Sequence, residues 1–170
     1  MRNQKFEIRN GFTLVELIIV IAIVSILAAA IFVAIDPARR LHEARNARRQ
    51  TDVVAMAEAL KQYQVDHDGD HFGEVNNATG DVYHILGAQV LMCDTTCSAV
   101  AVSNTDCVDL RDIGSDYLAT VPQDPKVGTE NHTGYYILKD SNGTLTVGAC
   151  EPEGEGAGGG GVAPKIEVTR

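Results

Sequence analysis

The longest hydrophobic segment of the chain runs from Phe12 to Ile35 and contains only three polar residues, Thr13, Glu16 and Ser25. As an α-helix, these 24 residues would be about 36 Å long, enough to cross a bilayer core about 30 Å thick. Glu16 is out of place here, because a carboxylate within a bilayer costs roughly 3 kcal/mol or more. The pattern therefore predicts a membrane-spanning helix in which Glu16 has a charged partner.

Hydrophobic positions at helical spacing continue beyond Pro37. Residues 36–66 are rich in Ala, Arg, Glu and Leu, and they contain no Gly and no second Pro. Proline removes a backbone donor, so we predict one long helix from about 12 to 66 that is kinked or loosened near Pro37. One face of its second half carries a hydrophobic stripe, which consists of Val53, Met56, Ala57, Leu60 and Tyr63.

Alternating hydrophobic and polar positions in the last third of the chain predict a β-hairpin. The runs 134–139 and 144–149 flank the turn sequence Asp140–Gly143. We expect the hydrophobic face of this hairpin to cover the helix stripe. Val82–Leu86 and Ala99–Val102 are each compatible with a short strand. The predicted fold class is α+β, with a long N-terminal helix packed on a small antiparallel sheet.

These patterns divide the chain into five segments with different expected roles. They are a basic leader (1–11), a hydrophobic helix (12–35), an amphipathic helix (36–66), a globular head (67–150) and a glycine-rich tail (151–170). The sequence EGEGAGGGGVAP in the tail is typical of a flexible linker, so we expect the tail to be mostly disordered. The run 165–170 can either add an edge strand or stay disordered.

The charge distribution narrows the choice of function. The net charge of −9 argues against a general nucleic-acid binder. Five arginines nevertheless fall within eleven residues: Arg39, Arg40, Arg45, Arg48 and Arg49. We expect them to form a solvated helix surface or to contact acidic heads of other subunits, with DNA or anionic lipid as alternatives. Three basic residues precede the hydrophobic helix but five arginines follow it, so the Lys and Arg count alone does not place the N-terminus inside.

Four cysteines, Cys93, Cys97, Cys107 and Cys150, all lie beyond the hydrophobic helix. An even number in an exported domain predicts two disulfides, for which three connectivities exist. We favour a bond from Cys150 back into the 93–107 segment. A metal site built on Cys93 and Cys97 is the alternative, but their spacing differs from that of structural zinc sites.

No catalytic arrangement is present in the sequence, so we expect neither an enzyme nor a cofactor. A GxSxG motif, a Walker loop and a dinucleotide fingerprint are all missing. The alternation of Asp66, Asp68 and Asp70 resembles the first half of a calcium loop. The match fails because position six is His71 and position twelve is Asn77.

Three processing events are compatible with the N-terminal region. An ordinary secretory signal would be cut after Ala28–Ala30, an uncut segment would stay as an anchor, and cleavage between Gly11 and Phe12 would leave the hydrophobic helix on the mature chain. The sequence from Gly11 to Glu16, GFTLVE, followed by about twenty hydrophobic residues, resembles the N-termini of type IV pilins and of type II secretion pseudopilins. The resemblance favours the third event.

The resemblance also implies a pilin-like fold and a set of partners. Prepilin peptidase would cut after Gly11, Phe12 would be N-methylated, and the N-terminus would lie on the cytoplasmic side. The chain would span the bilayer once, and a membrane assembly platform would then polymerise it with copies of itself into an extracellular or periplasmic filament. The α-amine of Phe12 would pair with Glu16 of a neighbour, because each is otherwise an unpaired charge in a hydrophobic core.

The segment Tyr117–Pro125, YLATVPQDP, is similar to a segment of the major pseudopilins of type II secretion. Some of these bind calcium through a later acidic loop, which this sequence lacks, so we do not transfer that site. Three functions stay open at this point. They are a subunit of a type IV pilus-like filament, a major pseudopilin, and a DNA-uptake pilin that uses the arginine cluster.

Overall fold

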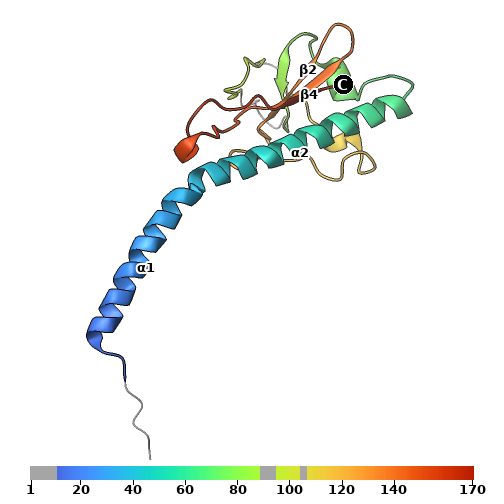
Figure 1. The fold of residues 1–170 in the computed structure, drawn as a ribbon. Coiled ribbons are helices and arrows are strands. Elements are labelled where there is room, and N and C mark those ends of the chain that lie inside the picture. The colour runs from blue at the N-terminus through green and yellow to red at the C-terminus, as the bar shows by residue number, and fades with distance from the viewer. Residues whose placement is uncertain (1–10, 89–94, 104–106) are drawn as a thin grey trace, which may run out of the picture. The chain divides into compact units, whose positions relative to one another are not determined.

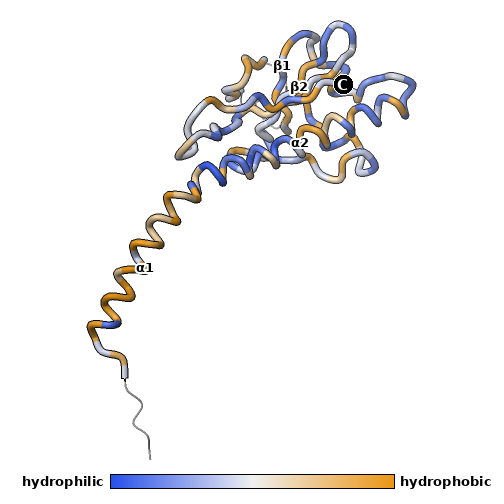
Figure 2. The backbone as a smooth tube through the Cα atoms, in the orientation of Figure 1, coloured by the Kyte–Doolittle hydropathy of each residue, from blue (hydrophilic) through white to orange (hydrophobic). Residues whose placement is uncertain are grey.

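The computed structural model describes residues 11–88, 95–103 and 107–170. It contains two compact units, residues 1–37 and 38–170, and each is considered separately here. The first unit consists mainly of α1, Leu14–Ile35, none of whose side chains is buried. Within the described residues, the helical stretch that begins at Leu14 is the one with the length and composition to cross a membrane. Figure 2 shows that α1 is hydrophobic almost throughout, whereas the helix that follows is mixed.

Regular helical backbone is interrupted at Asp36, directly before Pro37. Asp36 has left-handed dihedral angles, φ 48° and ψ 71°, and α2 then runs from Pro37 to Asp66 (Figure 1). The interruption near Pro37 agrees with the sequence-based prediction, and it has a second physical reason beside the missing donor of Pro37: the residue before a proline is disfavoured in the right-handed helical region.

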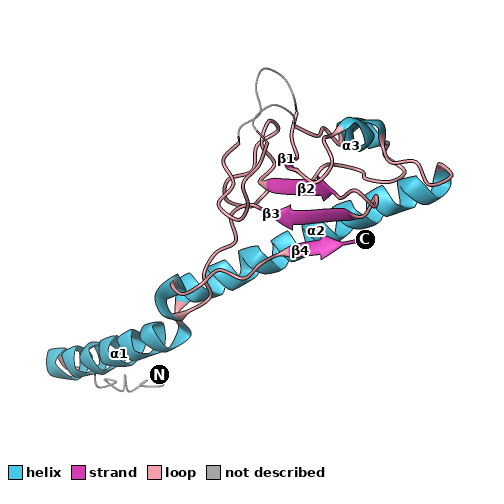
Figure 3. Cartoon of the chain, turned by 90° about the horizontal axis from the view of Figure 1, so that it is seen from above, coloured by secondary structure: helices cyan, strands magenta, loops and turns pink. Residues whose placement is uncertain are grey.

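The second unit packs α2 on a four-stranded antiparallel sheet with the order β1-β2-β3-β4 (Figure 3). The strands are Tyr83–Ile85, Tyr135–Lys139, Leu145–Ala149 and Glu167–Thr169. A short helix, α3 (Gly73–Asn77), and two 3-10 turns at Arg111–Ile113 and Ala157–Gly159 complete the described elements. The α+β prediction is confirmed.

The main core lies between α2 and one face of the sheet. Val53, Met56 and Leu60 of α2 are fully or almost fully buried against Tyr135 and Val147. Neighbouring residues of the hairpin point the other way, since side chains alternate along a strand. There, Tyr136 packs with Ile85, Cys107 and Cys150 in a second cluster. The predicted hairpin and its contact with the helix stripe are confirmed.

Two segments differ from the sequence-based expectation. Ala99–Val102 does not form a strand, because only Val102 makes an isolated bridge to Tyr83. The tail is also not simply a linker. Its strand β4 pairs with β3, with Val168 opposite Val147, and Ile166 is buried in the main core. The prediction of a disordered tail is therefore wrong. A high glycine content indicates a flexible backbone, but it does not show whether residues on either side of the glycines hold the tail against the head.

Candidate functional site

The proposed cleavage site lies in accessible backbone just before α1. Gly11 and Phe12 are both outside the helix, and 89% of the Phe12 surface is exposed. A peptidase needs an unstructured peptide bond that it can reach, and the bond between these two residues meets that condition.

Thr13 and Glu16 start α1 with a reciprocal pair of hydrogen bonds. The Glu16 backbone N–H donates to Thr13 Oγ1 (3.2 Å), and the Thr13 backbone N–H donates to Glu16 Oε2 (2.8 Å). This capping box satisfies two backbone donors that a helix N-terminus otherwise leaves unpaired. The T-x-x-E spacing of Thr13 and Glu16 is the sequence signal that marks this cap.

The capping box also fixes where the Glu16 carboxylate lies. Its Oε2 atom accepts a second hydrogen bond from Thr13 Oγ1 (2.9 Å), so the carboxylate points back toward the start of the helix. Cleavage between Gly11 and Phe12 would create an α-amine one residue before Thr13. A carboxylate aimed at this end is therefore positioned to meet such an amine, from its own chain or from a neighbouring one.

A second polar site lies inside the head and centres on Arg49, whose side chain is completely buried. The guanidinium donates to Asp124 through Nε (2.6 Å to Oδ2) and Nη2 (3.1 Å to Oδ1). Its Nη1 donates to Glu153 Oε2 (3.0 Å) and to Asn46 Oδ1 (2.9 Å). Arg49 thus joins α2 to the 122–128 loop and to the tail.

Further contacts complete the environment of Glu153. Its Oε1 atom accepts from Lys126 Nζ (3.0 Å) and from Arg45 Nη1 (3.1 Å), and its backbone N–H donates to Asn46 Oδ1 (3.0 Å). Burial by itself would raise the pKa of Glu153, but Lys126 and Arg49 lower that pKa to about 2. Burial would likewise raise the pKa of Asp124, and Arg49 with two backbone N–H donors keeps it below its usual range.

Comparison with protein families gives one match, to the prokaryotic N-terminal methylation motif, over residues 8–32. The chain carries the class III signal of type IV pilins and pseudopilins. The matched residues include Gly11, Phe12 and Glu16 and extend into α1. Comparisons with curated proteins and with solved structures found no match.

The methylation motif indicates the class of precursor. Its match does not extend to the head, which is described by the structure alone. It supports a structural subunit that is a type IV pilin-like or pseudopilin precursor. It also implies processing by prepilin peptidase and polymerisation, and α1 fits the single-pass anchor of such precursors. The match does not distinguish pilus, secretion and competence roles. The basic leader residues Arg2, Lys5 and Arg9 lie outside the described residues.

The arginine cluster proves to be heterogeneous. Arg49 is buried, and Arg45 is bonded to Glu153, so neither belongs to the solvated surface that we predicted. The sequence could not show this, because Asp124 and Glu153 are 75 and 104 residues away from Arg49. Arg39, Arg40 and Arg48 remain largely exposed; the first two bond to Glu43, and the third lies 3.7 Å from Asp52.

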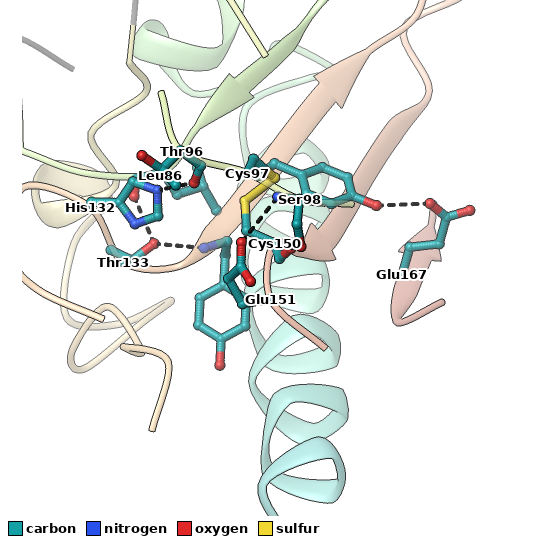
Figure 4. Close-up of a disulfide and its surroundings, with 11 residues drawn as sticks. Leu86, Thr96, Cys97, Ser98, His132, Thr133, Cys150, Glu151 and Glu167 are labelled. Carbon is teal, nitrogen blue, oxygen red and sulfur yellow. Dashed lines mark hydrogen bonds between the residues drawn. A yellow bond between two sulfur atoms is a disulfide. The ribbon is translucent and has the colours of Figure 1, made fainter. Parts of the chain in front are cut away.

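The structure joins Cys97 to Cys150 in a disulfide, which agrees with the expected bond from Cys150 back into the 93–107 segment (Figure 4). Ser98 Oγ donates to the Cys150 carbonyl oxygen (2.9 Å), and its backbone N–H donates to Glu151. Cys107 is also disulfide-bonded, whereas Cys93 lies outside the described residues. The bond attaches the 95–103 loop to the end of β3.

No group of three or more His, Cys, Asp or Glu side chains within the described ranges is placed to hold a metal ion. Asp66, Asp68 and Asp70, the residues that resemble half of a calcium loop, are exposed; Asp66 ends α2, and the other two follow it. That the protein works without a cofactor stays a prediction.

Proposed function

We propose that this chain is a pilin, cleaved between Gly11 and Phe12, methylated on Phe12, and polymerised into a type IV pilus-like filament. The observation that carries the proposal is the methylation motif, which extends into a hydrophobic helix, α1, that has no buried side chain. The sixteen large hydrophobic side chains exposed between Phe12 and Ile35 cannot stay in water without a cost of roughly 25 cal/mol per Å² of surface. A bilayer and a filament core are two environments that remove this cost.

Glu16 distinguishes the two environments. In a bilayer its carboxylate has no Lys or Arg partner in α1, and the α-amine of its own Phe12 is the cation of its own segment that it could meet. In a bundle of helices, the α-amine of Phe12 from a neighbouring copy supplies that partner. Pairing these charges would fix the axial register between copies as well as stabilise the assembly.

Electron microscopy of cells that express an epitope-tagged chain tests the proposal. We expect long surface fibres that carry the tag throughout their length. A tag that remains in the cell envelope, with no fibres in a strain whose assembly machinery is intact, would contradict the pilus.

A major pseudopilin of a type II secretion system is the second candidate, and the segment Tyr117–Pro125 favours it. In the structure this segment leads into the Asp124 loop, which holds Arg49. Its resemblance to the pseudopilin segment can thus reflect a common structural role in holding the head together, rather than a common function. Short periplasmic assemblies that are required for protein secretion would support this candidate over the pilus.

Contacts inside the head weaken the case for a DNA-uptake role, because they engage Arg45 and Arg49. Replacing Arg45, Arg48 and Arg49 together would not test this role, because Arg49 is buried and the variant would damage folding. The exposed residues Arg39, Arg40 and Arg48 are the appropriate set. Replacing them with Gln and measuring DNA retention by intact filaments would test this role.

A further inference from the structure

The head presents an exposed leucine very close in sequence to the hydrophobic helix. Leu41 is 56% exposed, and it follows the end of α1, Ile35, by six residues. Arg39 and Arg40 precede it, with side chains that are 49% and 68% exposed. Both guanidiniums bond to the same carboxylate, that of Glu43. The start of α2 therefore combines a hydrophobic side chain with two arginines that share one acid.

The glycine-rich part of the tail brings a second exposed hydrophobic side chain to the same part of the head. His42 Nδ1 lies 2.8 Å from the Gly154 carbonyl oxygen, and Gly159 packs so closely on the His42 ring that a Cβ atom there would overlap it. The 3-10 turn Ala157–Gly159 accordingly lies beside the start of α2 (Figure 1). Val162 follows this turn and is 95% exposed.

We propose that this surface, Leu41 and Val162 with Arg39 and Arg40, docks on an anionic phospholipid membrane before the subunit is assembled. The membrane is the one that α1 spans, and the leaflet is the one at which α1 ends. The inference thus rests on the membrane-anchored stage of the proposed function, and it adds a lipid contact of the head that anchoring alone does not require.

Covalent connection limits how far this surface can be from lipid. Six residues of extended chain reach about 20 Å at most, and the same six residues in a helix rise about 9 Å. The screening length at physiological salt is about 8 Å, so Arg39 and Arg40 stay close enough for anionic head groups to attract them.

Hydrophobic insertion and charge act together in such contacts. An exposed aliphatic side chain gains by entering the boundary between head groups and acyl chains, and neighbouring basic residues gain from anionic lipid. Two acidic groups near the surface already have cationic partners: Glu43 bonds to Arg39 and Arg40, and Glu153 bonds to Arg45 and Lys126. They therefore oppose docking less than free carboxylates would.

The test uses the full chain reconstituted through α1 into vesicles. One set contains phosphatidylcholine alone, and the other contains equal amounts of phosphatidylcholine and phosphatidylglycerol. An environment-sensitive fluorophore is attached to a Val162→Cys variant; within the described residues, the native cysteines Cys97, Cys107 and Cys150 are disulfide-bonded and do not compete for the label. Asp68→Cys provides the control position, because Asp68 is exposed beyond the far end of α2.

We expect the label at position 162 to move to a less polar environment in anionic vesicles and the label at position 68 to stay unchanged. Replacing Arg39 and Arg40 with Gln should lower the docked fraction by about fivefold for each arginine. Lys61→Gln, which removes an exposed positive charge near the other end of α2, should have no effect.

The possible failures are distinguishable. Chains that do not float with the vesicles at all would contradict the membrane anchor and with it the proposed function. Chains that float with the vesicles but report the same environment at position 162 in both lipids would overturn the docking proposal alone. A less polar environment at position 162 in neutral vesicles that occurs only with added DNA, or only at a high density of chains, would show that DNA or another copy of the chain binds this surface. That result would also overturn the docking proposal.

Discussion

Arg49 and Asp124 form a fully buried ion pair in which two guanidinium nitrogens, Nε and Nη2, meet two carboxylate oxygens at 2.6 and 3.1 Å. Both side chains have no exposed surface. A buried charge requires such compensation, because neither water nor mobile ions can reach it. The pair therefore connects α2 to the loop before the hairpin in a way that tolerates few substitutions.

Replacing Arg49 with Gln should destabilise the head by about 3–5 kcal/mol, because two carboxylates would lose their buried partner. Arg48→Gln is the matched control, since Arg48 is exposed and its change should cost less than about 1 kcal/mol. Chemical denaturation of the full chain in detergent measures both values. Equal stability of the two variants would show that the buried pair is not important for folding.

Acid should weaken the head through Glu153. The pKa of Glu153 is about 2 in the folded chain, against an ordinary value of 4.5 for a glutamate. Because the folded-state pKa is the lower one, Glu153 stabilises the head above pH 4.5, and this contribution is lost as the pH falls toward 2. A difference of this size corresponds to about 3 kcal/mol.

Glu153→Gln should therefore flatten the acid limb of the stability–pH curve and lower stability at neutral pH. The same substitution at Glu58, which is exposed on α2, should leave the curve unchanged. Denaturation midpoints measured across the acid range provide the comparison. An acid limb with the same amplitude in the Glu153 variant would mean that other carboxylates cause the loss.

Removing the disulfide by a double Cys97→Ser, Cys150→Ser substitution should cost about 2–4 kcal/mol, because the bond spans 53 residues of sequence. Ser98→Ala is the control, since it removes only the hydrogen bond to the Cys150 carbonyl and should cost about 1 kcal/mol. Thermal unfolding under non-reducing conditions compares them. A double variant as stable as Ser98→Ala would show that the sheet holds the loop without the bond.

Glu16→Gln should permit processing but reduce filament yield by more than about tenfold, because it removes the charge that pairs with the α-amine. The amide oxygen can still accept from the Thr13 backbone N–H, so the helix cap is retained. Ser25→Ala, a change to another polar residue of α1 whose hydroxyl bonds to the Ile21 carbonyl, should leave assembly intact. Quantifying sheared filaments gives the result, and normal yield from the Glu16 variant would refute its assembly role.

Local patterns predicted α1, α2 and the hairpin because the periodicity of a helix or a strand can be seen within a short stretch of sequence. Tyr135 and Ile137 alternate with Tyr136, for example, and the structure sends them into the two separate clusters. The motif from Gly11 to Glu16 was recognisable for the same reason, since all of its chemistry lies within six residues.

The Arg49 site was not predictable in this way. It is built from α2, the loop at Asp124 and the tail at Glu153, which meet only when the chain folds. Helical spacing separates Arg49 from the exposed Arg48, because Arg49 lies four residues before Val53 on the hydrophobic stripe, but this spacing does not identify its partners. The ordered tail was missed for a related reason: its polar anchor, Glu153, is surrounded by glycines that dominate the local composition.

The central claim is that a prepilin peptidase converts this chain into a filament subunit, and mass spectrometry of the mature N-terminus tests it most directly. The chain should be purified from cells with an intact processing pathway, and its N-terminal peptide should be sequenced. The account predicts a chain that starts at Phe12 with a methylated α-amine. A chain that starts at Ile31, as after ordinary signal cleavage, or one that retains residues 1–11 would contradict it.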